Sequence, residues 1–477
     1  MSDRTSLYRL SPDIICFGHR GGTIVAEGGR MRPILLNASK DEVSEILENI
    51  SSISPFCIDD IKNCLPDSLI EAFIESAVIY DVHPNQSKVS NPRRITEKPE
   101  HVSLFLVLNQ YCNLACVYCL EGKETYEAPA RREMSFEIAK RGILSFLDLL
   151  APGGHLGITL FGGEPLLSWP TILKILDFCK NAVGNDVNGR TISFAMQTNL
   201  SFIPEGFIEV VKENQIYLTI DVDGPPEVQN RLRPMKGRNS NSFDRVKMSI
   251  GTLSEHGVPY MLRCTLTSLN VGILEEVEQT HASLGSVEPT ELGLLRPVNS
   301  DGFVFPSNLM PGYNDIADAI TSGLDRNSSL INRYVDRYRD RAGGPLDWKH
   351  GCNAGFGLLP TLTYDGKIYP CTWFVGNKEL EIGDLAASPI VCEEAVRHVE
   401  NCLHIDHDPI CSTCSYRGIC GGGCGVTRVL TNYGQGSPLK TVAMDQARSM
   451  QCAITKTLTN YILSEAIEKQ LSAENAF

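Results

Sequence analysis

Long apolar runs are missing from this sequence: no stretch of about 18 apolar residues occurs, so we expect no membrane-spanning helix. The first residues, MSDRTSLYRL, lack the apolar core of a secretory signal, and we therefore expect a cytoplasmic protein. Basic residues are fewer than acidic ones, 43 against 57, and the net charge is −14. Nucleic acid is not an expected partner, because phosphate backbones require a basic face.

Hydrophobic residues make up 42% and charged residues 21% of the 477 positions, the balance of a globular protein long enough for two or three domains. Cysteine is the unusual component, with 17 copies. Disulfides are not expected, because the count is odd and no export signal is seen. Ten cysteines occur at ligand spacings, and we interpret the others as ordinary packed thiols. These others are Cys16, Cys57, Cys64, Cys179, Cys264, Cys392 and Cys402.

The chain divides into four segments by pattern. Residues 1–95 predict three short strands followed by two helices, closed by a polar stretch that contains proline. Residues 96–310 alternate strands with helices, 311–345 predict a helical bridge, and 346–477 hold the second group of cysteines.

The second segment predicts six strands, at 101–109, 155–163, 191–199, 216–224, 258–267 and 290–298. Helices are expected between them at 135–150, 171–183, 204–214, 243–257 and 273–284. Such repeats predict an α/β fold with a parallel sheet, either doubly wound or curled into a partial barrel. In both arrangements functional groups gather at the C-terminal ends of the strands.

Three cysteines follow the first of these strands in the spacing Cys112-x3-Cys116-x2-Cys119. Thiolates are the usual ligands of iron–sulfur clusters, and three of them in one loop can bind three irons and leave the fourth without a protein ligand. Zinc is the alternative, but a structural zinc site requires a fourth protein ligand.

This spacing at the end of a first βα strand resembles the radical S-adenosylmethionine (SAM) superfamily, whose fold is a partial (β/α)6 TIM-like barrel. The resemblance implies that Gly162, Gly163 and Glu164 hold the methionine amino group, with Glu164 accepting from the ammonium. It implies cofactor contacts for Tyr118, Thr198, Asn199 and Asp221, and an Arg233 fork for the cofactor carboxylate. Relatives usually have His-Asp before this arginine, whereas this chain has Gln229-Asn230.

The chemistry that the resemblance implies is reductive cleavage of SAM. A 5′-deoxyadenosyl radical then abstracts hydrogen from a substrate, in a site that excludes water.

The C-terminal cysteines resemble the SPASM extension found on peptide-modifying members of this superfamily. The pattern is Cys352-x13-Gly366-x4-Cys371, then Cys411-x2-Cys414-x5-Cys420-x3-Cys424, then Cys452. By resemblance, an outer cluster is held by Cys411, Cys414, Cys420 and Cys452, and an inner one by Cys352, Cys371 and Cys424. The chain would then hold three [4Fe-4S] clusters. A zinc ribbon at Cys411 and Cys414 is the alternative, and the fourth ligand of the inner cluster stays open.

The substrate class is also indicated by resemblance. Three strands followed by helices resemble the small winged-helix-like domains that bind leader peptides. Sulfatase-maturing relatives carry a basic aspartate after the second cysteine of the SPASM set, where this chain has Thr372, which cannot serve as that base.

We therefore expect a maturase that crosslinks a precursor peptide and takes electrons from a donor such as flavodoxin or ferredoxin. An epimerase with Cys264 as hydrogen donor, a protein or small-molecule substrate, and a non-catalytic iron–sulfur protein are the alternatives.

Overall fold

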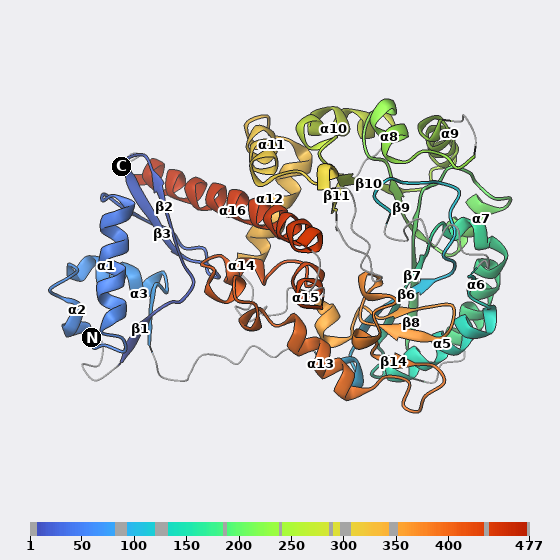
Figure 1. The fold of residues 1–477 in the computed structure, drawn as a ribbon, viewed down its shortest axis with the longest axis horizontal. Helices are drawn as coiled ribbons and strands as arrows, with labels where there is room; N and C mark the ends of the chain where they lie inside the picture. The colour runs from blue at the N-terminus through green and yellow to red at the C-terminus, as the bar shows by residue number, and fades with distance from the viewer. Residues whose placement is uncertain are drawn as a thin grey trace.

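The computed structural model describes residues 7–81, 93–119, 132–184, 188–237, 241–285, 290–295, 307–342, 352–433 and 438–474. Figure 1 shows a small N-terminal unit at one end of the molecule and a large sheet with surrounding helices at the other. The long helix α16 (Pro438–Glu474) extends from the N-terminal unit toward the sheet.

All six predicted strands of the second segment are present and parallel. They are β6 (His101–Val107), β7 (His155–Phe161), β8 (Thr191–Thr198), β9 (Tyr217–Asp221), β10 (Tyr260–Leu266) and β11 (Glu291–Leu294). Each pairs with its sequence neighbour, and the order never reverses. This single direction of winding contradicts the doubly wound alternative and is the order found in a barrel.

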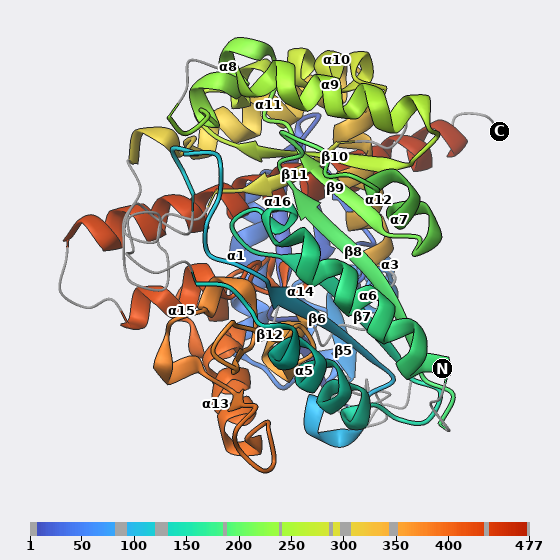
Figure 2. The same cartoon turned by 90° about the vertical axis from the view of Figure 1, so that its right-hand side faces the viewer.

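The helices that connect these strands cover one face of the sheet (Figure 2). They are α5 (Phe136–Leu149), α6 (Trp169–Gly184), α7 (Phe207–Glu213), α8 (Pro226–Leu232), α9 (Ser242–Glu255) and α10 (Leu274–Ser283). Alternate strand residues explain the packing: Val102, Leu104 and Leu106 of β6 are fully buried in the main core, while Ser103 and Phe105 on the other face are half-buried. Helix α8 was not predicted from the sequence.

The C-terminal part extends the same sheet. Strand β12 (Thr361–Leu362) pairs parallel with β6, and β13 (Lys367–Tyr369) and β14 (Gly383–Asp384) follow antiparallel. The sheet is therefore mixed. The predicted bridge consists of α11 (Tyr313–Asp325) and α12 (Ser329–Ala342), and α13 (Glu393–Leu403), α14 (Arg417–Cys420) and α15 (Val426–Tyr433) precede α16.

The N-terminal unit has more strands than predicted. It contains β1 (Tyr8–Leu10), β2 (Ile14–His19), β3 (Gly22–Glu27), β4 (Ile34–Leu36), α1 (Lys40–Ser52), α2 (Ile58–Ile61), α3 (Asp67–Glu75) and β5 (Ile79–Asp81). The first predicted strand is split into β1 and β2, and β1 pairs with β5 rather than with its neighbour. A three-stranded sheet, β2-β3-β4, remains.

Both faces of this small sheet are covered. Val25 packs with α1 and α3 residues such as Val43 and Phe73. Ile24, one position earlier and on the opposite face, packs with Ile419 and the α16 residue Ile454. The alternation of a strand thus divides the sheet between two cores.

Among the described helices, none has both the length and the apolar character needed to cross a bilayer, α16 included. Most of the predicted polar linker, and the end of the strand predicted to reach 298, lie outside the described residues.

Candidate functional site

The three cysteines of the first motif lie in the loop that follows β6, and Cys119 is the last residue described there. Their thiols are close enough to interact. Burial raises the pKa of Cys116 well above its ordinary value, Arg233 lowers it, and the charges of Cys119 and Cys112 raise it further. The three thiols of this loop therefore lie close to one another.

The glycines after β7 allow this loop to lie against the strand end. A Cβ atom on Gly162 would be 2.4 Å from the carbonyl oxygen of Asn109, and one on Gly163 would be 2.3 Å from that of Tyr111. The approach is fixed by backbone hydrogen bonds from Gly163 N to Asn109 O (2.9 Å) and from Glu164 N to Tyr111 O (3.0 Å). Only glycine fits this close contact.

Glu164 is fully buried and joins β7 to β8. Its carboxylate accepts from the Thr198 hydroxyl (2.7 Å), Asn199 N (2.8 Å) and Leu166 N (3.1 Å). Burial raises the pKa of Glu164 to about 7, although these three hydrogen bonds lower it. These three donors use part of the acceptor capacity of the carboxylate, and its contact with a cofactor ammonium stays a prediction.

Asn199 connects the end of β8 to the cysteine loop. Its Nδ2 lies 3.0 Å from Asn113 Oδ1 and 3.5 Å from Cys112 Sγ. Leu114 N also donates to Cys112 Sγ, at 3.3 Å. The first thiol is thus oriented by a neighbouring strand as well as by its own loop.

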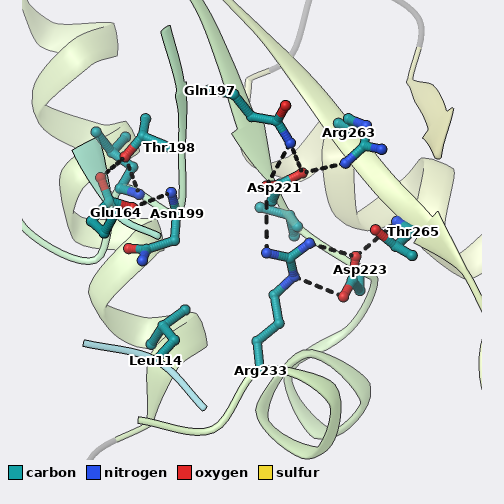
Figure 3. A network of polar contacts seen from close by, with 12 residues as sticks. Leu114, Glu164, Gln197, Thr198, Asn199, Asp221, Asp223, Arg233, Arg263 and Thr265 are labelled. Carbon is teal, nitrogen blue, oxygen red and sulfur yellow. Dashed lines mark hydrogen bonds and ion pairs between the residues drawn. The ribbon is translucent and has the colours of Figure 1, made fainter. Parts of the chain in front are cut away.

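A buried charge network lies beside this loop (Figure 3). Arg233 Nε donates to Asp223 Oδ2 at 2.8 Å, whereas Nη2 and Nη1 make longer contacts, 3.5 Å to Asp223 and 3.4 Å to Asp221. The guanidinium also lies over the Tyr118 ring, 5.3 Å from its centroid, and the Tyr118 hydroxyl donates to Asp223. The cysteine loop is therefore tied to the end of β9.

Asp221 extends the network along the sheet. Arg263 Nη1 donates to it at 3.1 Å and Gln197 Nε2 at 3.2 Å. Burial alone would raise the pKa of Asp221, but the charges of Arg233 and Arg263 hold it below its ordinary value. Asp221 thus remains a carboxylate in contact with two guanidinium groups.

Three of the C-terminal cysteines form a second set: Cys352, Cys371 and Cys424. Burial raises the pKa of Cys371 well above its ordinary value, and the charges of Cys352 and Cys424 raise it further. The hairpin from β12 to β13 positions Cys371, and its turn requires Gly366, which has φ +85°.

The remaining four cysteines form a third set. Burial raises the pKa of Cys452, and the charges of Cys420 and Cys414 raise it further. Cys420 also raises the pKa of Cys411, after burial and Asp408. Thr455, on α16 near Cys452, donates its hydroxyl to Cys420 Sγ at 3.5 Å.

Within the described residues, no three of these side chains are arranged as a preformed site for a single metal ion. Ligands of an iron–sulfur cluster bind different irons, so they stand farther apart than the ligands of one zinc ion. The numbers of thiols in the three sets, three, three and four, are those expected for ligands of iron–sulfur clusters.

Three neighbouring residues were not singled out from the sequence. Asn109 is fully buried after β6, and its Nδ2 donates to Glu164 O and Ser168 Oγ, both at 2.8 Å. Lys236 lies near the first three thiols, whose charges raise its pKa against the lowering by burial. Arg263 is the third. Asn109 and Arg263 lie on or directly after predicted strands, and this position was the sequence feature that could have indicated them as site residues.

Comparison with known proteins agrees with this geometry. Residues 106–284 match the family model of the radical SAM superfamily. The chain is 24% identical over 330 residues to a cysteine-type anaerobic sulfatase-maturating enzyme of Clostridium novyi, covering 66% of this chain and 84% of that enzyme. It is 23% identical over 421 residues to the radical SAM cyclopropyl synthase TigE of Paramaledivibacter caminithermalis, covering 80% of this chain and 79% of TigE.

A solved structure has the same fold. Native anSMEcpe with bound AdoMet superposes with a TM-score of 0.61 at 18% identity, over 77% of this chain and 98% of that one.

Proposed function

We propose that this chain, which carries a radical SAM domain and is homologous to anaerobic sulfatase-maturating enzymes and to TigE, modifies a ribosomally made precursor peptide by closing an intramolecular crosslink. The bond formed would be C–S, C–C or C–O. The observation that carries the proposal is the grouping of ten cysteines into three separate sets in one chain.

The first set, Cys112, Cys116 and Cys119, would hold the cluster that binds SAM. When bound, this cluster and SAM supply a 5′-deoxyadenosyl radical, which takes hydrogen from the substrate. We assign the methionine ammonium to the Gly162–Glu164 segment, where the Glu164 carboxylate has acceptor capacity beyond its three protein donors. Arg233 is fixed by its short Nε contact, and its longer Nη contacts leave donor capacity for a carboxylate.

Tyr118, Thr198, Asn199 and Asp221 complete this proposed cofactor site. They come from the cysteine loop and the ends of β8 and β9, so one sheet edge gathers them around the first set. Asp221 and Arg233 are 8% and 5% exposed, a dry environment that would protect a reactive radical.

The second and third sets would hold the inner and outer auxiliary clusters. Closing a crosslink removes two hydrogens from the peptide: one leaves as a hydrogen atom and the other as a proton with one electron. A nearby oxidised cluster is a suitable acceptor for that electron. The inner set, in contact with the main core next to β6, is our candidate.

We assign the N-terminal unit to leader binding. Its three-stranded sheet has two edge strands, β2 and β4, and an extended peptide can add to such an edge through main-chain hydrogen bonds. The backbone of this unit lies directly against the loop that carries the outer set. A Cβ atom added to Gly28 would be only 2.8 Å from the carbonyl oxygen of Ser415.

Two alternatives are less well supported. Epimerisation needs a thiol near the substrate, but Cys264 is fully buried and its Sγ lies 3.3 Å from Asn270 Nδ2. Several relatives are named as sulfatase-maturating enzymes. In this chain, however, Thr372 follows Cys371 at the position where that reaction would need a base.

The decisive experiment replaces Cys112, Cys116 and Cys119 together by alanine in the full chain. We expect no 5′-deoxyadenosine, and a fall in iron from about twelve to about eight atoms per chain after anaerobic reconstitution. Replacement of Cys57 and Cys64 by alanine is the matched control, because neither belongs to a set. Retained SAM cleavage in the triple variant would contradict the assignment of the first set.

The product separates the crosslink from its alternatives. A candidate precursor peptide, expressed with the enzyme, should become two mass units lighter when one ring closes. A mass that is unchanged in ordinary water, together with uptake of one deuterium at an α-carbon in heavy water, would instead establish epimerisation.

A further inference from the structure

Arg428 on α15 is a permanent cation inside the C-terminal part of the molecule. It is 2% exposed and is one of the largest fully enclosed side chains. Its Nη2 donates to Leu403 O at 2.8 Å. A guanidinium keeps its charge in proteins, so burial here does not neutralise it.

The position of this cation is defined by the segment that joins the two auxiliary sets. Gly421, Gly422 and Gly423 connect Cys420 to Cys424, with φ of +61°, +78° and +63°. A Cβ on Gly422 would be 2.9 Å from Arg428 Cζ, so the guanidinium lies directly against this backbone. Arg428 therefore lies beside the segment that joins Cys420, of the third (outer) set, to Cys424, of the second (inner) set.

The charge of Arg428 is therefore close to a ligand of each set, since the glycines that it packs against run from Cys420 of the outer set to Cys424 of the inner set. Its backbone is held to the same loop by the hydrogen bond from Arg428 N to Gly425 O (3.0 Å). Arg448 differs: its Nη2 is paired with Asp408 at 2.8 Å, and Asp408 accepts from Cys411 N at 2.9 Å, so Arg448 lies beside the outer set.

We propose that Arg428 is a positioning residue shared by the two auxiliary sites, where its buried charge offsets thiolate charge in both and raises the reduction potentials of both clusters. The inference rests on the proposed auxiliary clusters. One-electron reduction makes a cluster more negative, and a cation in a low-dielectric interior stabilises that reduced form.

The test uses the full chain with Cys112, Cys116 and Cys119 replaced by alanine, so that only auxiliary clusters contribute. The reconstituted protein is titrated with dithionite, and both reduced clusters are followed by electron paramagnetic resonance. Arg428→Gln should move both midpoint potentials to more negative values. Arg428→Lys keeps the charge without the planar fork, so both potentials should move the same way but less. Arg448→Gln, the matched control, should shift the outer cluster alone.

The outcomes are distinguishable. A parent protein with almost no iron would contradict the auxiliary clusters themselves, before any change at Arg428. Two loaded clusters with unshifted potentials in Arg428→Gln, or a shift in one cluster only, would overturn the shared role. If Arg428→Gln does not fold by circular dichroism, Arg428→Lys decides: unshifted potentials for both clusters overturn the proposal.

Discussion

A methyl group on Gly163 would collide with the backbone of the loop that carries the first three cysteines. We expect Gly163→Ala to destabilise the protein by about 2–3 kcal/mol, because its Cβ would be 2.3 Å from Tyr111 O and backbone cannot move aside as a flexible side chain can. The displaced loop should also bind less iron. Urea unfolding and iron analysis of the reconstituted protein measure both effects.

Gly157→Ala, on the strand β7 that precedes Gly163, is the matched control, since the nearest atom to its added Cβ is 3.8 Å away. We expect its stability to be within about 0.5 kcal/mol of the parent's. If Gly163→Ala kept full iron and an unchanged unfolding midpoint, the close approach of the two loops would not matter for the site.

At this scale the sequence predicted residue identity better than side-chain direction. Local spacing indicated the first set, and the resemblance to the SPASM extension predicted the other two; thiols of the same set are close enough to affect one another's pKa. The contact of Glu164 with a cofactor ammonium stays a prediction, and its hydrogen bonds with Thr198 and Asn199 were not predicted. The direction of a carboxylate depends on donors from a neighbouring strand, which sequence pattern does not specify.

Between elements, the buried His281 fastens α10 to the end of β9. Its Nε2 lies 2.8 Å from Val222 O and its Nδ1 2.6 Å from Thr290 Oγ1, so the ring is a neutral imidazole that donates to the carbonyl and accepts from the hydroxyl. Burial lowers the pKa of His281 to about 4, although the hydrogen bond to Val222 raises it.

This geometry predicts a pH-dependent stability. In the unfolded chain the imidazole takes up a proton below pH 6.5, whereas in the folded protein it stays neutral to about pH 4, so stability is lost as pH falls through this window. Between pH 7.5 and 5 we expect His281 to contribute a loss of about 2 kcal/mol. Urea unfolding of the parent and of His281→Gln measures it, and the variant should lose less stability over the same range. Equal losses would contradict the assignment.

The elements that the sequence predicted are those with a strong local pattern. Six strands with apolar alternation and five helices of the core follow from periodicity. Strand β12 has two residues, and its partner β6 lies some 250 positions earlier, so only tertiary pairing defines it. For the same reason β1 pairs with β5, across the helices between them.

In the whole molecule, the N-terminal unit is packed onto the C-terminal part rather than tethered beside it. Asp13 is paired with Arg417 of the outer cysteine loop, and the hairpin residues His19 and Arg20 contact Glu468 of α16 at 2.8 and 2.6 Å. The sequence predicted a separate small domain, because its strands and helices are local. It could not predict this docking, because both faces of β3 are apolar and the sequence does not show which element packs on each face. Leader binding is therefore best tested in the full chain.

Neighbouring residues on β3 offer a test of this arrangement, because their side chains enter different cores. Ile24 is fully buried against α16 and its neighbours, and Val25 is fully buried against the unit's own helices. A buried, unpaired carboxylate costs several kcal/mol, about 3–5 here. Ile24→Asp should therefore release the N-terminal unit while leaving it folded. Small-angle scattering should report a larger radius of gyration, and far-UV circular dichroism should stay close to the parent's.

Val25→Asp should instead unfold the unit itself, with loss of the helical signal of α1 and α3. Glu468→Gln, which removes only the partly exposed ion pairs, should cost less than about 1 kcal/mol and keep the unit docked. Release should also lower the iron held by the outer set, because Gly28 and Gly418 lie against each other's loops in the docked state. An Ile24→Asp protein with the parent's radius of gyration and full iron would mean that docking does not depend on this apolar face.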